Sequence, residues 1–157
     1  MMRKTAPIVI AATLALFLPS VCLGQTVAST ESLAFGDVFP GVPKTVVKTS
    51  ASAAEFTITG TADAEVTLDF DLPSYLSTTG GNMPVFFSST DCAVDSTNPP
   101  NQGSPSYNNQ NPYQTITYRL GSAGLKVWLG GQIVPGLAQK AGSYNATIRL
   151  TVTYTGN

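Results

Sequence analysis

Two aspartates have a spacing that could support catalysis. Asp69 and Asp71 are two positions apart in a strand-like segment, so their carboxylates share one face, as glycoside hydrolysis requires of its two acids. The sequence has no histidine, which removes the usual general base and the commonest metal ligand. A Ser-His-Asp or Cys-His site is therefore excluded. We expect both aspartates to be solvated, and we predict a protein that is not an enzyme, with no catalytic residues and no cofactor.

Metal and thiol chemistry have less support. Asp91 and Asp95 lie among hydroxyl-bearing residues and could offer hard oxygen ligands to calcium. No motif of fixed ligand spacing surrounds them, so we predict no metal site. Cys92 is the only cysteine after residue 24, which leaves two interpretations, a small buried thiol or a disulfide between chains.

Residues 1–24 have the pattern of a cleaved signal peptide. Two basic residues precede an apolar run, residues 8–18, which a Pro-Ser pair ends. We predict cleavage after Gly24 and export of the remaining chain; lipidation at Cys22 is the alternative. The apolar run is shorter than the ~20 residues that span a bilayer, so we expect no stable membrane insertion after cleavage.

Residues 25–157 fit one domain of ordinary size. Without the two basic residues of the leader, six basic residues remain against nine acidic ones. Nucleic acids and anionic membranes are bound by clustered Lys and Arg, so this balance argues against both as partners. We expect no nucleic-acid partner.

Short alternating segments separated by turn residues predict an all-β protein. In residues 65–72, for example, Val66 and Leu68 point inward while Glu65 and Thr67 point outward. Strands that each bury one face favour two packed antiparallel sheets, an immunoglobulin-like β-sandwich. The expected strands are residues 33–36, 45–47, 55–60, 65–72, 83–87, 114–120, 125–131 and 144–154.

Residues 88–112 break this pattern. They are rich in Ser, Asn, Gln and Pro, a composition that buries little apolar surface, so we predict a long polar surface loop. Tyr107, Tyr113 and the surrounding Asn and Gln residues could form a surface that contacts a glycan, and the loop could also bind a protein. We expect Trp128, by contrast, to lie in the core or half-buried on a sheet face.

The clearest alternation is in residues 144–154, where apolar and polar side chains alternate without a break. This strand could be a sheet edge to which another protein adds a strand; alternatively, an early strand, residues 33–35 or 45–47, already lies against it. An edge strand carries unpaired backbone groups, which makes it a template for such β-augmentation.

Several short motifs resemble a bacterial family, domain of unknown function 4402, which is similar in pattern to spore coat protein U domains. Both resemble the immunoglobulin-like subunits of chaperone–usher pili. The resemblance covers residues 33–154, and it implies an exported envelope or surface domain without known catalysis, completed in the pilin relatives by a donated strand. The chain differs from many relatives in having no cysteine pair. The motifs are Leu33-x-Phe35-Gly36, Phe56-x-Ile58-x-Gly60, Val66-x-Leu68, Val127-x-Leu129-Gly130-Gly131, Gln139-x-Ala141-Gly142-x-Tyr144-x-x-Thr147 and Val152-x-Tyr154.

Two functions follow as hypotheses. The first is a structural or adhesive, pilus-like subunit of the periplasm or cell surface; the alternative is a self-contained secreted binding module that uses residues 88–112. A donor strand needs bulky apolar residues at alternate positions. Residues 25–32 offer only Val27 and small or polar side chains, so we expect the chain to be a poor strand donor.

Overall fold

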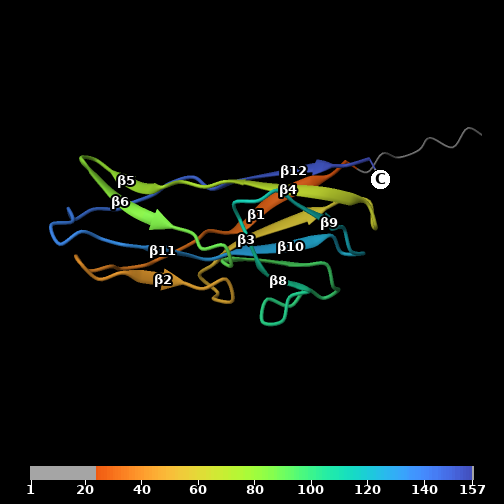
Figure 1. Cartoon of the computed structure of the whole chain (residues 1–157), viewed down its shortest axis with the longest axis horizontal. Coiled ribbons are helices and arrows are strands. Elements are labelled where there is room, and N and C mark those ends of the chain that lie inside the picture. The colour runs from red at the N-terminus through yellow and green to blue at the C-terminus, as the bar shows by residue number, and fades with distance from the viewer. Residues whose placement is uncertain (1–23, 157) are drawn as a thin grey trace, which may run out of the picture.

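The computed structural model describes residues 24–156, and these form an all-β, antiparallel structure (Figure 1). The predicted fold class, an immunoglobulin-like β-sandwich, is confirmed. The described strands are β1 (Thr26–Glu31), β2 (Lys44–Val46), β3 (Ala54–Thr59), β4 (Glu65–Asp71), β5 (Tyr75–Thr78), β6 (Gly81–Phe86), β7 (Cys92–Asp95), β8 (Tyr107–Gln110), β9 (Ile116–Arg119), β10 (Leu125–Leu129), β11 (Gly131–Ile133) and β12 (Arg149–Tyr154).

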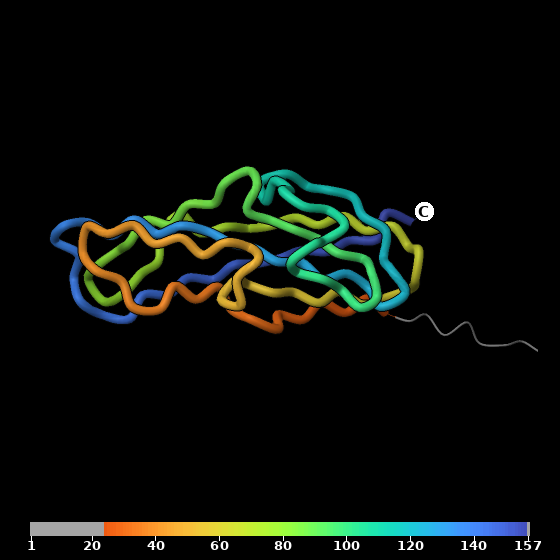
Figure 2. The backbone as a smooth tube through the Cα atoms, turned by 90° about the horizontal axis from the view of Figure 1, so that it is seen from below, coloured from red at the N-terminus to blue at the C-terminus, as the bar shows by residue number. Residues whose placement is uncertain are grey.

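The strands form three hydrogen-bonded sheets. One has the order β1-β3-β10-β7-β8, the second β12-β4-β9 and the third β2-β11-β6-β5. Only a single glycine, Gly130, separates β10 from β11, so one long path of chain runs through two sheets and makes the molecule elongated (Figure 2). A Cβ on Gly130 would lie 2.5 Å from the carbonyl oxygen of Val46, so this crossing requires glycine.

A single apolar cluster joins the layers. Phe56 of β3 meets Phe70 of β4 edge to face, with ring centroids 5.9 Å apart. Ile58, Val66 and Val127 are fully buried in the same cluster. β3 and β4 therefore alternate as the sequence predicts, and their inward side chains share one core between facing sheets.

The range predicted as a surface loop, residues 88–112, contains two strands, one near each of its ends. β7 lies inside this range and is an interior strand of the five-stranded sheet, between β10 and β8, with all four residues buried. β8 also lies in the range, at the edge of that sheet. A four-residue strand that is buried on both faces shows no alternation of polar and apolar residues. The residues on either side of β7 have the composition of a loop, so the sequence did not indicate a strand there.

Asp95 organises the rest of that range. Its side chain points away from the apolar core, is 1% exposed and accepts hydrogen bonds from the backbone N–H groups of Thr97 (3.1 Å), Asn101 (2.7 Å) and Ser106 (3.3 Å). The hydroxyls of Thr97 and Ser106 donate to it as well. Burial by itself raises the pKa of Asp95, but these donors outweigh it and hold that pKa well below its usual value.

Residues 96–106 cover the outer face of the five-stranded sheet. Gln102 donates to the carbonyl oxygens of Lys48 (2.8 Å) and Ser50 (2.9 Å), so the loop crosses β10 from β7 to the segment before β3. Trp128, on that outer face, is only 3% exposed. Its indole N–H donates to Glu55 at 2.8 Å, as expected for a buried indole.

Four further boundaries differ from the expectation. Residues 26–31 form β1, which pairs with β3. All six residues are exposed, so the sequence has no alternation of buried and exposed side chains there that would have predicted a strand. Residues 33–36 form no strand, and β5 was missed because it is a short hairpin partner of β6. Regular pairing with β4 begins only at Arg149; before it, Asn145 makes an isolated bridge to Ser77.

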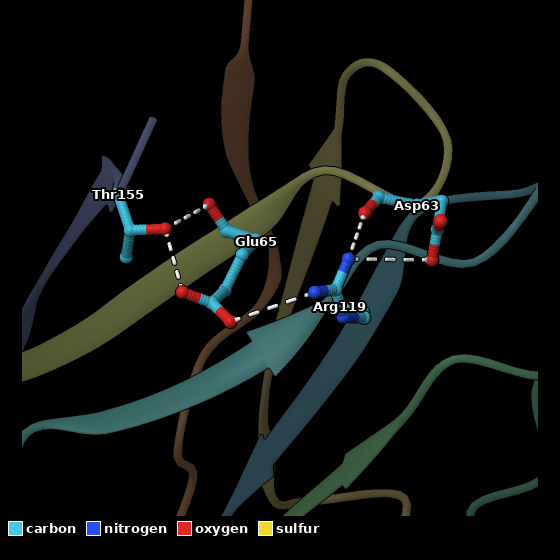
Figure 3. Close-up of polar contacts among 4 residues, drawn as sticks. All are labelled: Asp63, Glu65, Arg119 and Thr155. Atoms are coloured by element: carbon cyan, nitrogen blue, oxygen red, sulfur yellow. Dashed lines mark hydrogen bonds and ion pairs between the residues drawn. The ribbon is translucent and has the colours of Figure 1, made fainter. Parts of the chain in front are cut away.

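Polar contacts fasten the end of β12 to the adjoining strands (Figure 3). The hydroxyl of Thr155 donates to the Glu65 carboxylate at 2.7 Å, and Arg119 of β9 lies 3.9 Å from the same carboxylate. Arg119 also donates to the carbonyl oxygen of Asp63 at 2.9 Å. These exposed contacts align three strand ends, and each contributes little free energy by itself.

Replacing Asp95 should destabilise the domain. Asp95→Ala leaves several buried donors without an acceptor, so we expect a loss of about 3 kcal/mol in the free energy of unfolding, measured by urea denaturation. Asp71→Ala, at an exposed position, is the matched control and should change that free energy by less than about 0.5 kcal/mol.

The same carboxylate predicts a pH dependence. The folded-state pKa of Asp95 is depressed, so its contribution is present above the unfolded value near 3.8 and is lost as pH falls through the lower folded value. Wild-type stability should therefore fall on acidification below about pH 4 more steeply than that of Asp95→Asn. Equal slopes for the two proteins would contradict the role given to Asp95.

Candidate functional site

Two strand edges of the sandwich flank the same side of the core. β1 is the edge of the five-stranded sheet and pairs only with β3, and β12 is the edge of the three-stranded sheet and pairs only with β4, among the residues described. Neither the segment of residues 33–36 nor β2 lies against β12, because β2 pairs with β11. The seam between β1 and β12 is not bridged by any described strand.

A groove of about 680 Å³ with an apolar floor lies beside this seam. One wall is formed by residues 29–38, which follow and overlap β1, and the other by residues 142–148, which lead into β12. The floor consists of core side chains from β3, β5, β6 and β11 and the segment after β6. Its apolar residues include Phe56, Leu76, Met83, Val85, Phe87 and Ile133.

The wall of residues 142–148 presents free backbone groups to the groove. Asn145 uses both its N–H (3.1 Å) and its C=O (2.9 Å) to bond with Ser77 of β5. In an extended chain successive residues direct these groups to opposite sides, so those of Tyr144 and Ala146 face the seam. The side chain of Ala146 shares the inward face with Tyr144 and Ile148, yet Ala146 is exposed, which is what an uncovered groove produces.

The opposite wall is held in the same manner. The N–H of Ala34 donates to the carbonyl oxygen of Ser52 at 2.9 Å, which extends the β1–β3 pairing beyond Glu31. The backbone groups of Leu33 and Phe35 then face the seam, by the same alternation. Both walls thus offer hydrogen-bond donors and acceptors across an apolar floor.

The N-terminal wall is anchored through Glu55. Its carboxylate accepts hydrogen bonds from Thr30 of β1 (2.8 Å) and Trp128 of β10 (2.8 Å), and it forms an ion pair with Lys126. Burial by itself raises the pKa of Glu55, but these partners lower it overall. β1 is therefore built into its own sheet, which agrees with the expectation that it is a poor donor of a strand to another molecule.

The acidic residues considered from the sequence do not converge. Asp69 and Asp71 are exposed on β4, and Asp69 accepts a hydrogen bond from Thr115 at 3.2 Å. Asp91 accepts one from the N–H of Ser88 at 2.7 Å, while Asp95 is saturated by its loop. Within residues 24–156, no group of three acidic, cysteine or histidine side chains lies together.

Cys92 is buried in β7, 3% exposed, and contributes to the apolar core. Of the two interpretations left open by the sequence, the structure supports the small buried thiol. Burial raises its pKa to about 12, against a smaller opposing effect of the Lys48 charge. Cys22 and the expected cleavage site before Gln25 concern residues 1–24, nearly all of which lie outside the described part.

The groove was not predicted as such. The sequence predicts a regular strand at the groove's C-terminal wall, and the alternation of Tyr144, Ala146 and Ile148 is the available signal. At the other wall it predicts a strand over residues 33–36, which could have lain against the C-terminal strand. Which strands pair cannot be seen from periodicity, so the sequence predicted an edge at β12 without the matching edge at β1.

Over residues 24–156, the antiparallel sandwich and its unbridged seam define an all-β domain whose edge strands β1 and β12 belong to different sheets and do not pair with each other. Residues 41–154 match the model of the family called domain of unknown function (DUF4402), and the chain belongs to that family. A comparison with curated proteins found no match. The described residues include no helix long and apolar enough to cross a membrane.

The thiol of Cys92 should be unreactive in the folded protein. Its burial and raised pKa keep it protonated at pH 8, so a maleimide or disulfide reagent should label it only after denaturation. Mass spectrometry of native and urea-treated samples measures this. Rapid labelling without denaturant, or an interchain disulfide on a non-reducing gel, would show that the buried-thiol interpretation is wrong.

Proposed function

We propose that this chain is an exported, non-enzymatic structural or adhesive subunit of the bacterial envelope or surface that accepts a β-strand from another protein. The observation that carries the proposal is the groove between residues 29–38 and 142–148, with an apolar floor and, among the described residues, unpaired backbone groups on both walls. An inserted strand would satisfy both edges and bury alternate side chains on the floor.

The donor is a different protein in this proposal. Its strand carries bulky apolar residues at alternate positions, because only these fill the groove while their neighbours face solvent. β1 of a second copy fits poorly, since its exposed residues are mostly small or polar and Thr30 is bonded within its own sheet. The similarity to spore coat protein U and to pilus subunits stays a prediction, as do the signal peptide and the export.

A binding module that uses residues 88–112 remains the second candidate. Tyr113, 62% exposed, lies just beyond this range, and Tyr107, 40% exposed, lies within it beside Asn108. Against this candidate, much of the range is committed to β7 and to the Asp95 loop. The groove has both shape and unpaired backbone groups, so we place the function there.

A synthetic strand tests the proposal. We expect a peptide of about seven residues, with Ile or Val alternating with Thr, to bind residues 25–157 and to raise the melting temperature. At a concentration 100 times its Kd, binding adds about 2.7 kcal/mol, equivalent to roughly 8 °C for a domain of this size. A peptide of the same composition with the apolar residues adjacent is the control.

Matched variants locate the binding. Ala146→Trp fills the groove from its wall and should abolish the peptide-induced rise in melting temperature. Thr151→Trp, on the solvent face of β12, adds the same side chain outside the groove and should leave the rise unchanged. No rise with wild type, or an equal rise with both variants, would refute a strand-accepting groove.

A further inference from the structure

The end of the sandwich away from the described C-terminus carries two Pro-Gly turns that touch each other. These turns, residues 39–43 and 134–138, are here called the tip (Figures 1 and 2). The N–H of Val42 donates to the carbonyl oxygen of Phe39 at 3.1 Å, and that of Gly41 donates across to Gly136 at 3.2 Å. One backbone hydrogen bond therefore closes the first turn, and another joins the first turn to the second.

The tip carries the two most exposed large apolar side chains among the described residues. Leu137 is 90% exposed, Phe39 72% and Val42 55%. Neither turn contains a charged residue. Apolar side chains that gather at one place on a small domain indicate a contact surface, whereas the same residues scattered singly would need no explanation.

The tip is also preorganised. Pro40 precedes Gly41, whose φ of +74° is the geometry that a type II turn requires at its third residue. A Cβ on Gly41 would lie 2.6 Å from Leu137 Cδ2, so the leucine side chain lies directly over this glycine. A partner that docks here therefore orders little of the tip, which lowers the entropic cost of binding.

The tip is continuous with the groove. Val38 ends one groove wall and is followed directly by Phe39. On the other side, Gln139 accepts a hydrogen bond from the N–H of Gly136 at 3.1 Å and donates to the Tyr144 hydroxyl at 2.6 Å. Tyr144 lines the groove, so hydrogen bonds join the second turn to the second wall.

We propose that the tip is a second contact for the strand-donating protein, which covers Phe39, Val42 and Leu137 with apolar residues adjacent to the end of its strand. This inference rests on the proposed function, because it takes the groove as the site of the strand. A strand that lies in the groove has one end beside the tip and the other at the opposite end of the groove. The tip is preorganised and uncharged, so we place the second contact at the tip.

Other occupants fit the tip less well. An anionic membrane attracts clustered Lys and Arg, and the ten residues of the two turns contain neither. A second copy docked tip to tip would leave the connection between the tip and the groove without a role. These alternatives give different results in the experiment below.

Three peptides test the inference on the protein with its leader removed, residues 25–157. The first is the alternating strand alone, and the others add a short Leu-Val-Phe extension at its N-terminal or C-terminal end. We expect one extension, the one that leaves the groove at the tip, to lower the Kd about tenfold, as burial of one or two apolar side chains does. The other extension should leave the Kd unchanged.

The double variant Phe39→Ser with Leu137→Ser should lose this gain and still bind the strand without extension as wild type does. Both side chains are exposed, so its melting temperature should match that of wild type; if it does not, Leu137→Ser alone replaces it. A gain that persists in the variant, or no gain from either extension, would overturn the inference.

The remaining outcomes separate the two proposals. If the strand without extension fails to bind, the strand-accepting function fails; if it binds and neither extension helps, only the tip contact fails. Sedimentation of the protein alone, and with vesicles that contain phosphatidylserine, tests the other occupants. Self-association or vesicle binding that disappears in the double variant would assign the tip to a second copy or to a membrane and refute the contact proposed.

Discussion

Unpaired backbone groups on two facing strand edges are the constraint on which the rest of this structure depends. Each N–H and C=O along an edge must bond to water or to another strand. In this sandwich β1 and β12 are edge strands of different sheets and do not pair with each other. The groove lies between residues 29–38, which overlap β1, and residues 142–148, which lead into β12, and no described strand bridges it.

The outer face of the five-stranded sheet, by contrast, is covered by the chain itself. Residues 96–106 cover the outer face of the five-stranded sheet, held by the buried carboxylate of Asp95 and by Gln102. Glu55 binds β1, β3 and β10 together on that face. Buried polar groups of this kind are stabilising only when fully hydrogen-bonded. The seam differs from this face, since its polar groups lie on the backbone and face outward.

The sequence predicted the parts of the fold that expose one face and bury the other. Residues 65–72 alternate cleanly, and β4 lies there with Val66 and Leu68 buried. β7 was missed because both of its faces are buried, one by the core and one by the Asp95 loop. β1 was missed for the opposite reason, since all its residues are exposed. The groove depends on two edges separated by more than a hundred residues, which no local pattern records.

The geometry of the walls explains why a strand is a better occupant than a small ligand. Ala34 and Asn145 bond away from the seam, so their neighbours' backbone groups point into it in alternation on both sides. A small molecule cannot satisfy two parallel rows of donors and acceptors, whereas an extended peptide matches both rows with its own backbone. Because the walls are already fixed, the incoming chain alone loses conformational freedom. Affinity then comes from the backbone, and specificity from the side chains that meet Ala146, Phe56 and the rest of the floor.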